Sequence, residues 1–251
     1  MLLSYFDSKK KGPVVLFIHG TASANGLWEK QYELLNNSHY RVIGVDLRGH
    51  GKSKNPGGDS TINDYINDLK ETLDYLKVRE SITIVGHSLG AVLGIRFAEK
   101  YPEKVNKLVL VSLPARIPRL LCRYYDWFLG EPIKFLKEKI NLILKLPVLK
   151  RYKFAICSDL NIVRQIWKEA VDWDFLTHKP KVQCPVYLSV GRFDYIALKD
   201  SLKKLHTEIP NSGFKVFEWA AHSCMEEQPK EFNKWLLTVL GLAILRHELG
   251  S

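Results

Sequence analysis

The chain alternates between short, uninterrupted apolar runs and longer segments in which apolar residues recur at helical spacing. Apolar runs without polar alternation predict strands that are buried on both faces, whereas helical spacing predicts amphipathic helices. The predicted strands are 14–18, 41–45, 82–85, 105–111, 186–190 and 215–219. The predicted helices are 27–35, 62–76, 91–101, 199–205 and 229–240. This alternation is typical of an α/β fold with a mostly parallel, doubly wound sheet.

The segment 113–181 breaks the alternation, because it contains no convincing strand pattern. Its aromatic and leucine-rich helical pieces are interrupted by Pro114, Pro118, Pro132 and Pro147. We interpret this segment as a helical cap inserted after the strand near residue 111, with 1–112 and 182–251 forming the core. Ligands bind at the carboxyl edge of open α/β sheets, where such a cap would lie.

A lone serine lies between two glycines just after the predicted strand 82–85, in the stretch Gly86-His-Ser88-Leu-Gly90. One interpretation is a tight turn in which the serine is only a filler. The other is a nucleophile held in a strained strand-to-helix turn, where glycines remove side chains that would clash. The helix that follows directs its N-terminus at this site and favours developing negative charge.

A serine hydroxyl needs a general base and an orienting acid to act as a nucleophile. Asp194 lies shortly after one predicted strand, and His222 lies just after the last one. Together with Ser88, these residues fall at the carboxyl ends of strands, which meet at one edge of a parallel sheet. We therefore predict a triad of Ser88, His222 and Asp194; Asp200 is a rival acid, but it falls inside a helical pattern.

The first predicted strand ends at His19-Gly20-Thr21. We predict that the backbone N–H groups of Thr21 and Leu89 form an oxyanion hole for the tetrahedral intermediate. Other polar residues of these loops are expected to brace the site rather than contact substrate: His19, Asp46, Arg48, His50 and His87. Four aromatic residues are candidates for lining a substrate pocket, although each can instead serve in packing: Trp28, Trp127, Trp167 and Phe193.

Five stretches together resemble the α/β-hydrolase-fold superfamily, in particular its small, lidded serine esterases: VVLFIHG, VIGVDLRGHGKS, IVGHSLGA, PVYLSVGRFD and WAAHSCMEEQPKEF. The resemblance covers about Val14 to Leu240 and implies the α/β-hydrolase fold and a serine triad. The chain departs from the family in carrying Ala221 before the histidine, where glycine is common, and in lacking a proline shortly after Asp194. Its short N-terminal section also suggests that the first antiparallel strand of the fold is missing.

These residues predict a hydrolase that cleaves small to medium carboxylic esters through an acyl-enzyme. The residue in the strained strand-to-helix turn is Ser88 rather than an aspartate, which argues against attack on alkyl halides or epoxides through an aspartate ester. A carbon–carbon hydrolase, a lactonase and an acyltransferase of the same fold remain open, as does a small-ligand signalling receptor that retains the triad. We expect no metal or organic cofactor, because Asp46 replaces the first glycine of a phosphate-loop pattern and no other cofactor motif is present.

The net charge of +10 is concentrated in one part of the predicted cap. Residues 116–153 contain ten Lys or Arg against three Asp or Glu. In 132–153, the apolar positions share a helical face, and four lysines lie largely away from it: Lys134, Lys137, Lys139 and Lys145. These lysines form either a solvated outer face or a docking surface for an acidic carrier protein or an anionic membrane. Nucleic acid is not expected as a partner, and the oligomeric state is left open.

Cysteine usage and hydropathy bear on the cellular location. The four cysteines are Cys122, Cys157, Cys184 and Cys224, and none shows the spacing of a zinc site or redox pair. We expect reduced thiols. The chain shows no secretory signal pattern, and its longest apolar run is too short to cross a bilayer. These observations predict a soluble, cytoplasmic protein.

Overall fold

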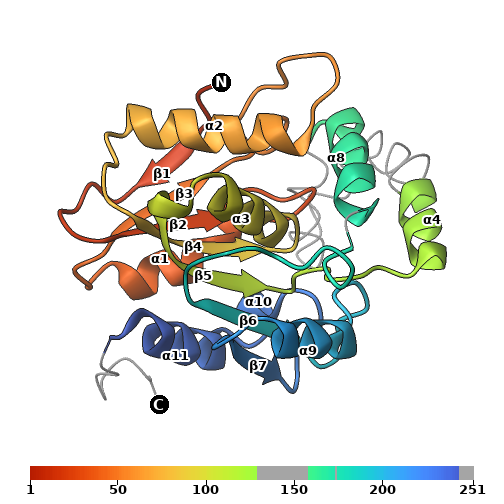
Figure 1. The fold of residues 1–251 in the computed structure, drawn as a ribbon. Helices are drawn as coiled ribbons and strands as arrows, with labels where there is room; N and C mark the ends of the chain where they lie inside the picture. The colour runs from red at the N-terminus through yellow and green to blue at the C-terminus, as the bar shows by residue number, and fades with distance from the viewer. Residues whose placement is uncertain (129–157, 173, 243–251) are drawn as a thin grey trace, which may run out of the picture.

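The protein is built around a seven-stranded sheet with the strand order β1-β3-β2-β4-β5-β6-β7 (Figure 1). This computed structural model describes residues 1–128, 158–172 and 174–242. All pairings from β3 to β7 are parallel, which confirms the predicted doubly wound sheet. The strands are β1 (Tyr5–Asp7), β2 (Val14–Ile18), β3 (Arg41–Val45), β4 (Ile82–His87), β5 (Val105–Val111), β6 (Val186–Gly191) and β7 (Gly213–Phe217).

The expectation that the first antiparallel strand is missing was wrong. β1 pairs antiparallel with β3, with Tyr5 opposite Val45 and Asp7 opposite Ile43. The Arg41 guanidinium donates to the Asp7 carboxylate at 2.7 Å, which ties the two strands together at this edge. β1 has only three residues, and none of them is fully buried, so it leaves no apolar run in the sequence.

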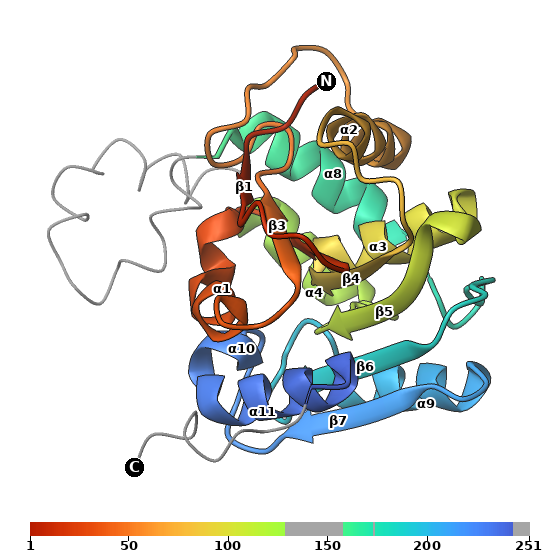
Figure 2. The same ribbon diagram turned by 90° about the vertical axis from the view of Figure 1, so that its left-hand side faces the viewer.

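Helices cover both faces of the sheet (Figures 1 and 2). Apolar residues of α2, α3, α8 and α9 pack in one cluster on one face of the sheet. Those of α1, α10 and α11 pack in a second cluster on the other face. The predicted helix 27–35 is divided into a short 3-10 turn and α1. The helical elements within the described residues are η1 (Asn25–Trp28), α1 (Glu29–Leu35), α2 (Ile62–Tyr75), α3 (Leu89–Lys100), η2 (Pro102–Lys104), α4 (Arg119–Phe128), α8 (Leu160–Asp172), α9 (Lys199–Glu208), α10 (Cys224–Glu227) and α11 (Pro229–Leu240).

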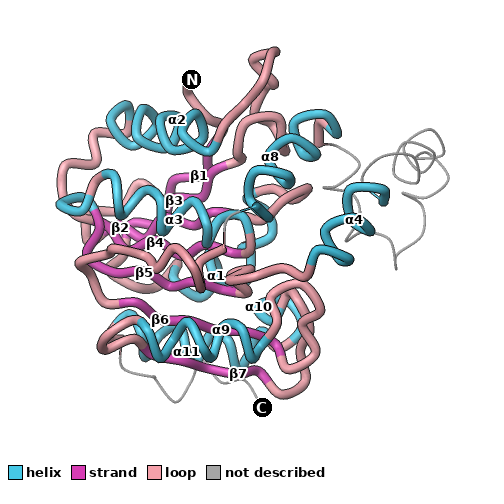
Figure 3. The backbone as a smooth tube through the Cα atoms, turned by 45° about the vertical axis from the view of Figure 1, so that its right-hand side comes forward, coloured by secondary structure: helices cyan, strands magenta, loops and turns pink. Residues whose placement is uncertain are grey.

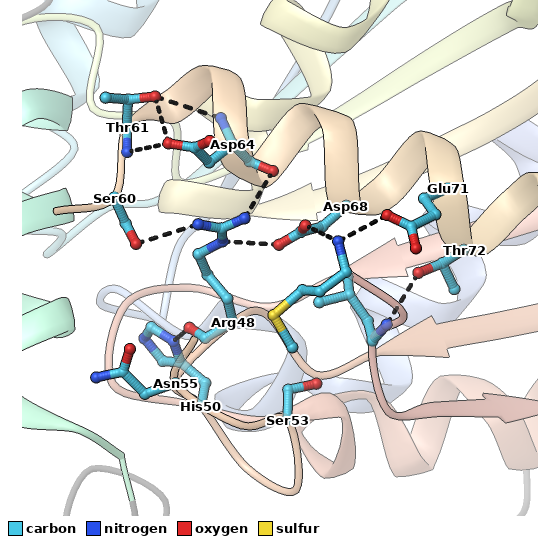
Figure 4. Close-up of polar contacts among 12 residues, drawn as sticks. Arg48, His50, Ser53, Asn55, Ser60, Thr61, Asp64, Asp68, Glu71 and Thr72 are labelled. Atoms are coloured by element: carbon cyan, nitrogen blue, oxygen red, sulfur yellow. Dashed lines mark hydrogen bonds and ion pairs between the residues drawn. The ribbon is translucent and has the colours of Figure 1, made fainter. Parts of the chain in front are cut away.

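A buried ion pair ties the segment after β3 to α2 (Figure 4). Arg48 Nε donates to Asp68 Oδ2 at 2.7 Å, and its other nitrogens donate to Ser60 and to the carbonyl of Asp64. Thr61 and Asp64 form a capping box at the start of α2. Arg48 therefore braces its loop, as expected from the sequence.

Two described helices, α4 and α8, lie in the segment 113–181, and no strand occurs in its described part. Both lie on the side of the molecule toward which the loops after β5 and β6 run (Figure 3). The lysines of the predicted cap, Lys134, Lys137, Lys139 and Lys145, lie outside the described residues. Within the described parts of the chain, we find no helix that is both long and apolar enough to span a membrane.

Candidate active site

Ser88 lies in a strained turn between β4 and α3. Its φ of 51° and ψ of −112° are unusual for a residue with a side chain, and such strain is common at functional sites. The Ser88 backbone N–H donates to the carbonyl of Val111 at 2.9 Å, which joins the turn to β5. A β-carbon on Gly86 would overlap the carbonyl of Gly90, and one on Gly90 would overlap that of Ile18. The turn therefore requires both glycines of the G-x-S-x-G pattern.

The structure brings His222 and Asp194 together from two separate loops. His222 Nδ1 lies 3.0 Å from each carboxylate oxygen of Asp194. Asp194 Oδ1 also accepts hydrogen bonds from the backbone N–H groups of Ile196 and Ala197, both at 2.9 Å. Burial acts to raise the pKa of Asp194, but His222 and these N–H donors outweigh it, so the pKa lies below its usual value. Asp194 is thus a fixed anion that orients the imidazole of His222.

The backbone around His222 is held at three successive residues. The carbonyl of Ala220 accepts from the Phe193 N–H at 2.9 Å, and the Ala221 N–H donates to the Glu227 carboxylate at 2.5 Å. The carbonyl of His222 lies 2.8 Å from His87 Nε2. Since His87 immediately precedes Ser88, this last contact links the serine turn directly to the loop that carries His222.

The loop that carries Thr21 lies against the serine turn. A β-carbon on Gly20 would lie 3.2 Å from the β-carbon of Ser88 and 2.9 Å from His87 Nδ1. The loop is fixed from the other side by Asp46, whose Oδ1 accepts the Asn25 N–H at 2.7 Å. Leu89 begins α3 directly after Ser88. Gly20 and Ser88 are therefore close together, and the two predicted oxyanion donors directly follow them: Thr21 follows Gly20, and Leu89 follows Ser88.

Two buried histidines brace these loops as neutral groups. His19 Nε2 accepts the Leu47 N–H at 3.0 Å, so the proton resides on Nδ1, which lies 2.7 Å from the carbonyl of Gly20. Burial, together with nearby His50, lowers the pKa of His19 well below its usual value. His50 Nδ1 lies 2.8 Å from the carbonyl of Arg48, and burial lowers the pKa of His50 to about 4. Both residues have the bracing role expected from the sequence.

A buried apolar cluster lies between the loops of Thr21 and Asp194. Ile196, two residues after Asp194, packs there, and Ala22, next to Thr21, contacts the cluster from the other side. The members from α8 are Val163 and Trp167, and Ile117 comes from the segment after β5. The site thus contains an apolar surface beside the predicted acid and oxyanion loop.

The four aromatic pocket candidates have different positions. Trp167 belongs to this apolar cluster, whereas Phe193 and Trp127 are exposed. Trp28 is fully buried in the cluster on the opposite face of the sheet, where its ring contacts those of Phe17 and Phe232. Trp28 thus serves in packing rather than in lining a pocket, because its side chain points into the core. The spacing of aromatic residues along the sequence does not reveal this direction.

Cys224, two residues after His222, is a buried thiol. Burial, with the nearby charges of Asp194 and Glu227, raises its pKa far above the usual value, so it is not a nucleophile at neutral pH. Cys122 and Cys184 are partly exposed, and Cys157 lies outside the described residues. Among residues 1–128, 158–172 and 174–242, no group of three or more His, Cys, Asp or Glu side chains is arranged to hold a metal ion.

Comparisons with known proteins agree with this architecture. The model of the alpha/beta hydrolase fold family matches residues 13–147, and the chain belongs to that family. A relative in Escherichia coli, named "Putative carbamate hydrolase RutD", is 29% identical over 94% of this chain and 93% of its own length. An esterase from Thermogutta terrifontis is 25% identical, with a TM-score of 0.79 over 94% of this chain and 93% of the other. The enol-lactonase from Burkholderia xenovorans is 20% identical, with a TM-score of 0.82 over 95% and 96%. The chain is therefore a hydrolase of the α/β fold.

Proposed function

We propose that the protein is a serine hydrolase that cleaves small to medium carboxylic esters. The observation that carries this proposal is the fixed pair of His222 and Asp194 beside the strained turn of Ser88, with His222 Nδ1 3.0 Å from both oxygens of the acid. An anion on the Nδ1 side keeps a proton there and leaves Nε2 free to accept one.

In the proposed reaction, Ser88 Oγ attacks the ester carbonyl while its proton passes to His222 Nε2. The backbone N–H groups of Thr21 and Leu89 stabilise the oxyanion of the tetrahedral intermediate. The intermediate collapses to an acyl-enzyme as His222 returns the proton to the departing alcohol. Water then attacks the acyl group with His222 as the base, which releases the acid and restores Ser88.

The apolar cluster beside these groups supports a substrate with an apolar acyl part. The buried members of the cluster are Ile117, Val163, Trp167 and Ile196, and such mainly apolar surroundings favour aliphatic or aromatic groups over charged ones. α4 and α8 lie on the side toward which the loops after β5 and β6 run, and in this proposal they belong to the cap formed by 113–181, which excludes water from the acyl-enzyme.

Carbamate hydrolysis is a second candidate function. The similarity to RutD, at 29% identity over 94% of this chain, favours it. The same triad can attack a carbamate carbonyl, but a carbamate without a hydrocarbon substituent would leave the apolar cluster unused. The apolar surroundings of the triad thus favour the ester proposal, whereas the similarity to RutD favours the carbamate alternative.

Steady-state turnover separates these candidates and the receptor hypothesis. p-Nitrophenyl esters of increasing acyl length should be hydrolysed catalytically, and Ser88→Ala should abolish this hydrolysis. A fluorophosphonate probe should label the wild type at Ser88 and fail to label the variant. Faster release of ammonia from a simple carbamate than of nitrophenol from any ester would favour carbamate hydrolysis. Labelling of Ser88 without multiple turnovers on any substrate would favour a ligand receptor.

A further inference from the structure

We propose that His87 is a positioning residue that sets the location of His222 relative to Ser88. This inference rests on the proposed function, in which Ser88 is the nucleophile and His222 is its base. His87 is not a member of the proposed triad, and it would act through His222. The main evidence is the contact between His87 Nε2 and the carbonyl oxygen of His222, which lie 2.8 Å apart although the two residues are 135 positions apart in the sequence.

The chemistry of the two atoms fixes the direction of this hydrogen bond. A backbone carbonyl only accepts, so His87 Nε2 must carry a hydrogen and donate it. The rings of His87 and His222 are also close, with centroids 4.8 Å apart and planes inclined by 56°. His87 thus holds both the backbone and one side of the ring of His222, while Asp194 holds its Nδ1.

The His87 ring is itself held on two further sides. Trp28, fully buried, meets it edge to face with centroids 6.5 Å apart and planes at 82°. Gly20 lies against its other nitrogen, because a β-carbon there would approach His87 Nδ1 to 2.9 Å. Only 5% of His87 is exposed, so the ring has little room to rotate. A ring fixed in this way can transmit the position of the serine turn to the loop of His222.

Adjacency in sequence makes this contact functionally significant. His87 ends β4 and directly precedes Ser88, so a shift of this strand end moves the nucleophile and the donor to His222 together. The same loop is also anchored through Ala220, which accepts from the Phe193 N–H, and through Ala221, which donates to Glu227, but only the bond from His87 joins it to the residue next to the nucleophile among the described backbone contacts. A displacement of about 1 Å between reacting groups can cost about 100-fold in rate.

Two substitutions of nearly equal length test the donated bond. In His87→Gln the side-chain Nε2 stands the same number of bonds from the backbone as in histidine and can still donate. In His87→Met the length is similar, but there is no donor. We expect His87→Met to lower kcat for a p-nitrophenyl ester by between about tenfold and about 100-fold with little change in KM. We expect His87→Gln to recover most of that loss.

The rate of fluorophosphonate labelling gives a second measure. Labelling requires His222 to activate Ser88, so it should slow in His87→Met in parallel with kcat and recover in His87→Gln. A matched control is His206→Met, since His206 bonds Ser212 at the far end of α9 and should leave kcat unchanged. Circular dichroism and thermal unfolding establish that each variant is folded.

The hydrogen bond from His87 can also be tested in the wild type, which does not depend on whether a variant folds. Nitrogen-15 spectra of the histidines should show a protonated Nε2 on His87 at neutral pH, and a bare Nε2 would exclude the bond. Equal impairment of the Gln and Met variants, or wild-type kcat in His87→Met, would also overturn the positioning role. Full hydrolysis by Ser88→Ala would instead overturn the proposed function, so the two failures are distinguishable.

Discussion

The carbonyl oxygen of Ala221 occupies the space that a β-carbon on Gly191 would require. Gly191 ends β6 three residues before Asp194, and Ala221 directly precedes His222. The last residue of one strand and the loop after the next are thus in direct backbone contact. This close approach holds Asp194 and His222 at hydrogen-bonding distance, and it is possible only for glycine at position 191.

We predict that Gly191→Ala separates these two loops. The opposing atoms are backbone, which cannot rotate away as a side chain can, so we expect a loss of about 1–3 kcal/mol in the free energy of unfolding. We also expect kcat to fall by about 100-fold, because His222 would move from its position beside Ser88. Urea unfolding and ester hydrolysis measure the two effects.

The control is Gly94→Ala in the buried part of α3. A β-carbon there would meet only side-chain atoms, the nearest at 3.3 Å on Ile84, and these can adjust. Its activity should stay near that of the wild type. A Gly191→Ala protein with unchanged kcat would contradict the structural account of this contact.

The sequence predicted the sheet and the candidate triad because each depends on local patterns. Mostly apolar runs marked the buried strands, and Ser88, Asp194 and His222 each followed a predicted strand. β1 was missed, because its short, partly exposed strand depends on pairing with β3 rather than on its own apolar content. The contact between His87 and His222 had no local signal, since it joins residues 135 positions apart. Only the folded arrangement reveals such a link.

Stability should decrease as the pH falls below neutrality because of buried, neutral histidines. Burial lowers the pKa of His50 from 6.5 to about 4, so the unfolded chain binds a proton over this interval and the folded protein does not. The free energy of unfolding is therefore lost as pH falls from 6.5 to about 4, by up to about 3 kcal/mol from His50 alone. Buried His19 acts in the same direction.

The test is urea unfolding at a series of pH values for the wild type and His50→Gln. The variant should be less stable at neutral pH, where it loses the packing of the ring, but its stability should decline less steeply on acidification. His39→Gln is the control for the chemical change from His to Gln, because His39 is exposed. Parallel curves for the wild type and His50→Gln would contradict this prediction.

Two tryptophans near the site should differ sharply in their effect on stability. Trp28 is fully buried, and its indole nitrogen has no hydrogen-bond partner among the described residues. Trp28→Ala should therefore cost about 3–5 kcal/mol through lost packing. Trp219 is 80% exposed, so Trp219→Ala should change stability by no more than about 0.5 kcal/mol. Chemical denaturation measures both, and similar losses would show that Trp28 does not pack as described.

The charge of Asp194 should matter more than its shape. In Asp194→Asn the amide oxygen can still accept from the N–H groups of Ile196 and Ala197, which leaves an NH₂ donor facing His222. His222 Nδ1 must then accept, which moves the proton to Nε2 and removes the lone pair that would take the proton of Ser88. A comparable change in a serine protease lowers kcat by about 10⁴-fold, and we expect a similar loss here. Asp200→Asn is the matched control, because the Asp200 side chain is 93% exposed and lies on α9, outside the site. Ester hydrolysis and fluorophosphonate labelling should both fall in Asp194→Asn and stay unchanged in Asp200→Asn. The opposite pattern would identify Asp200, the rival acid in the sequence, as the partner of His222.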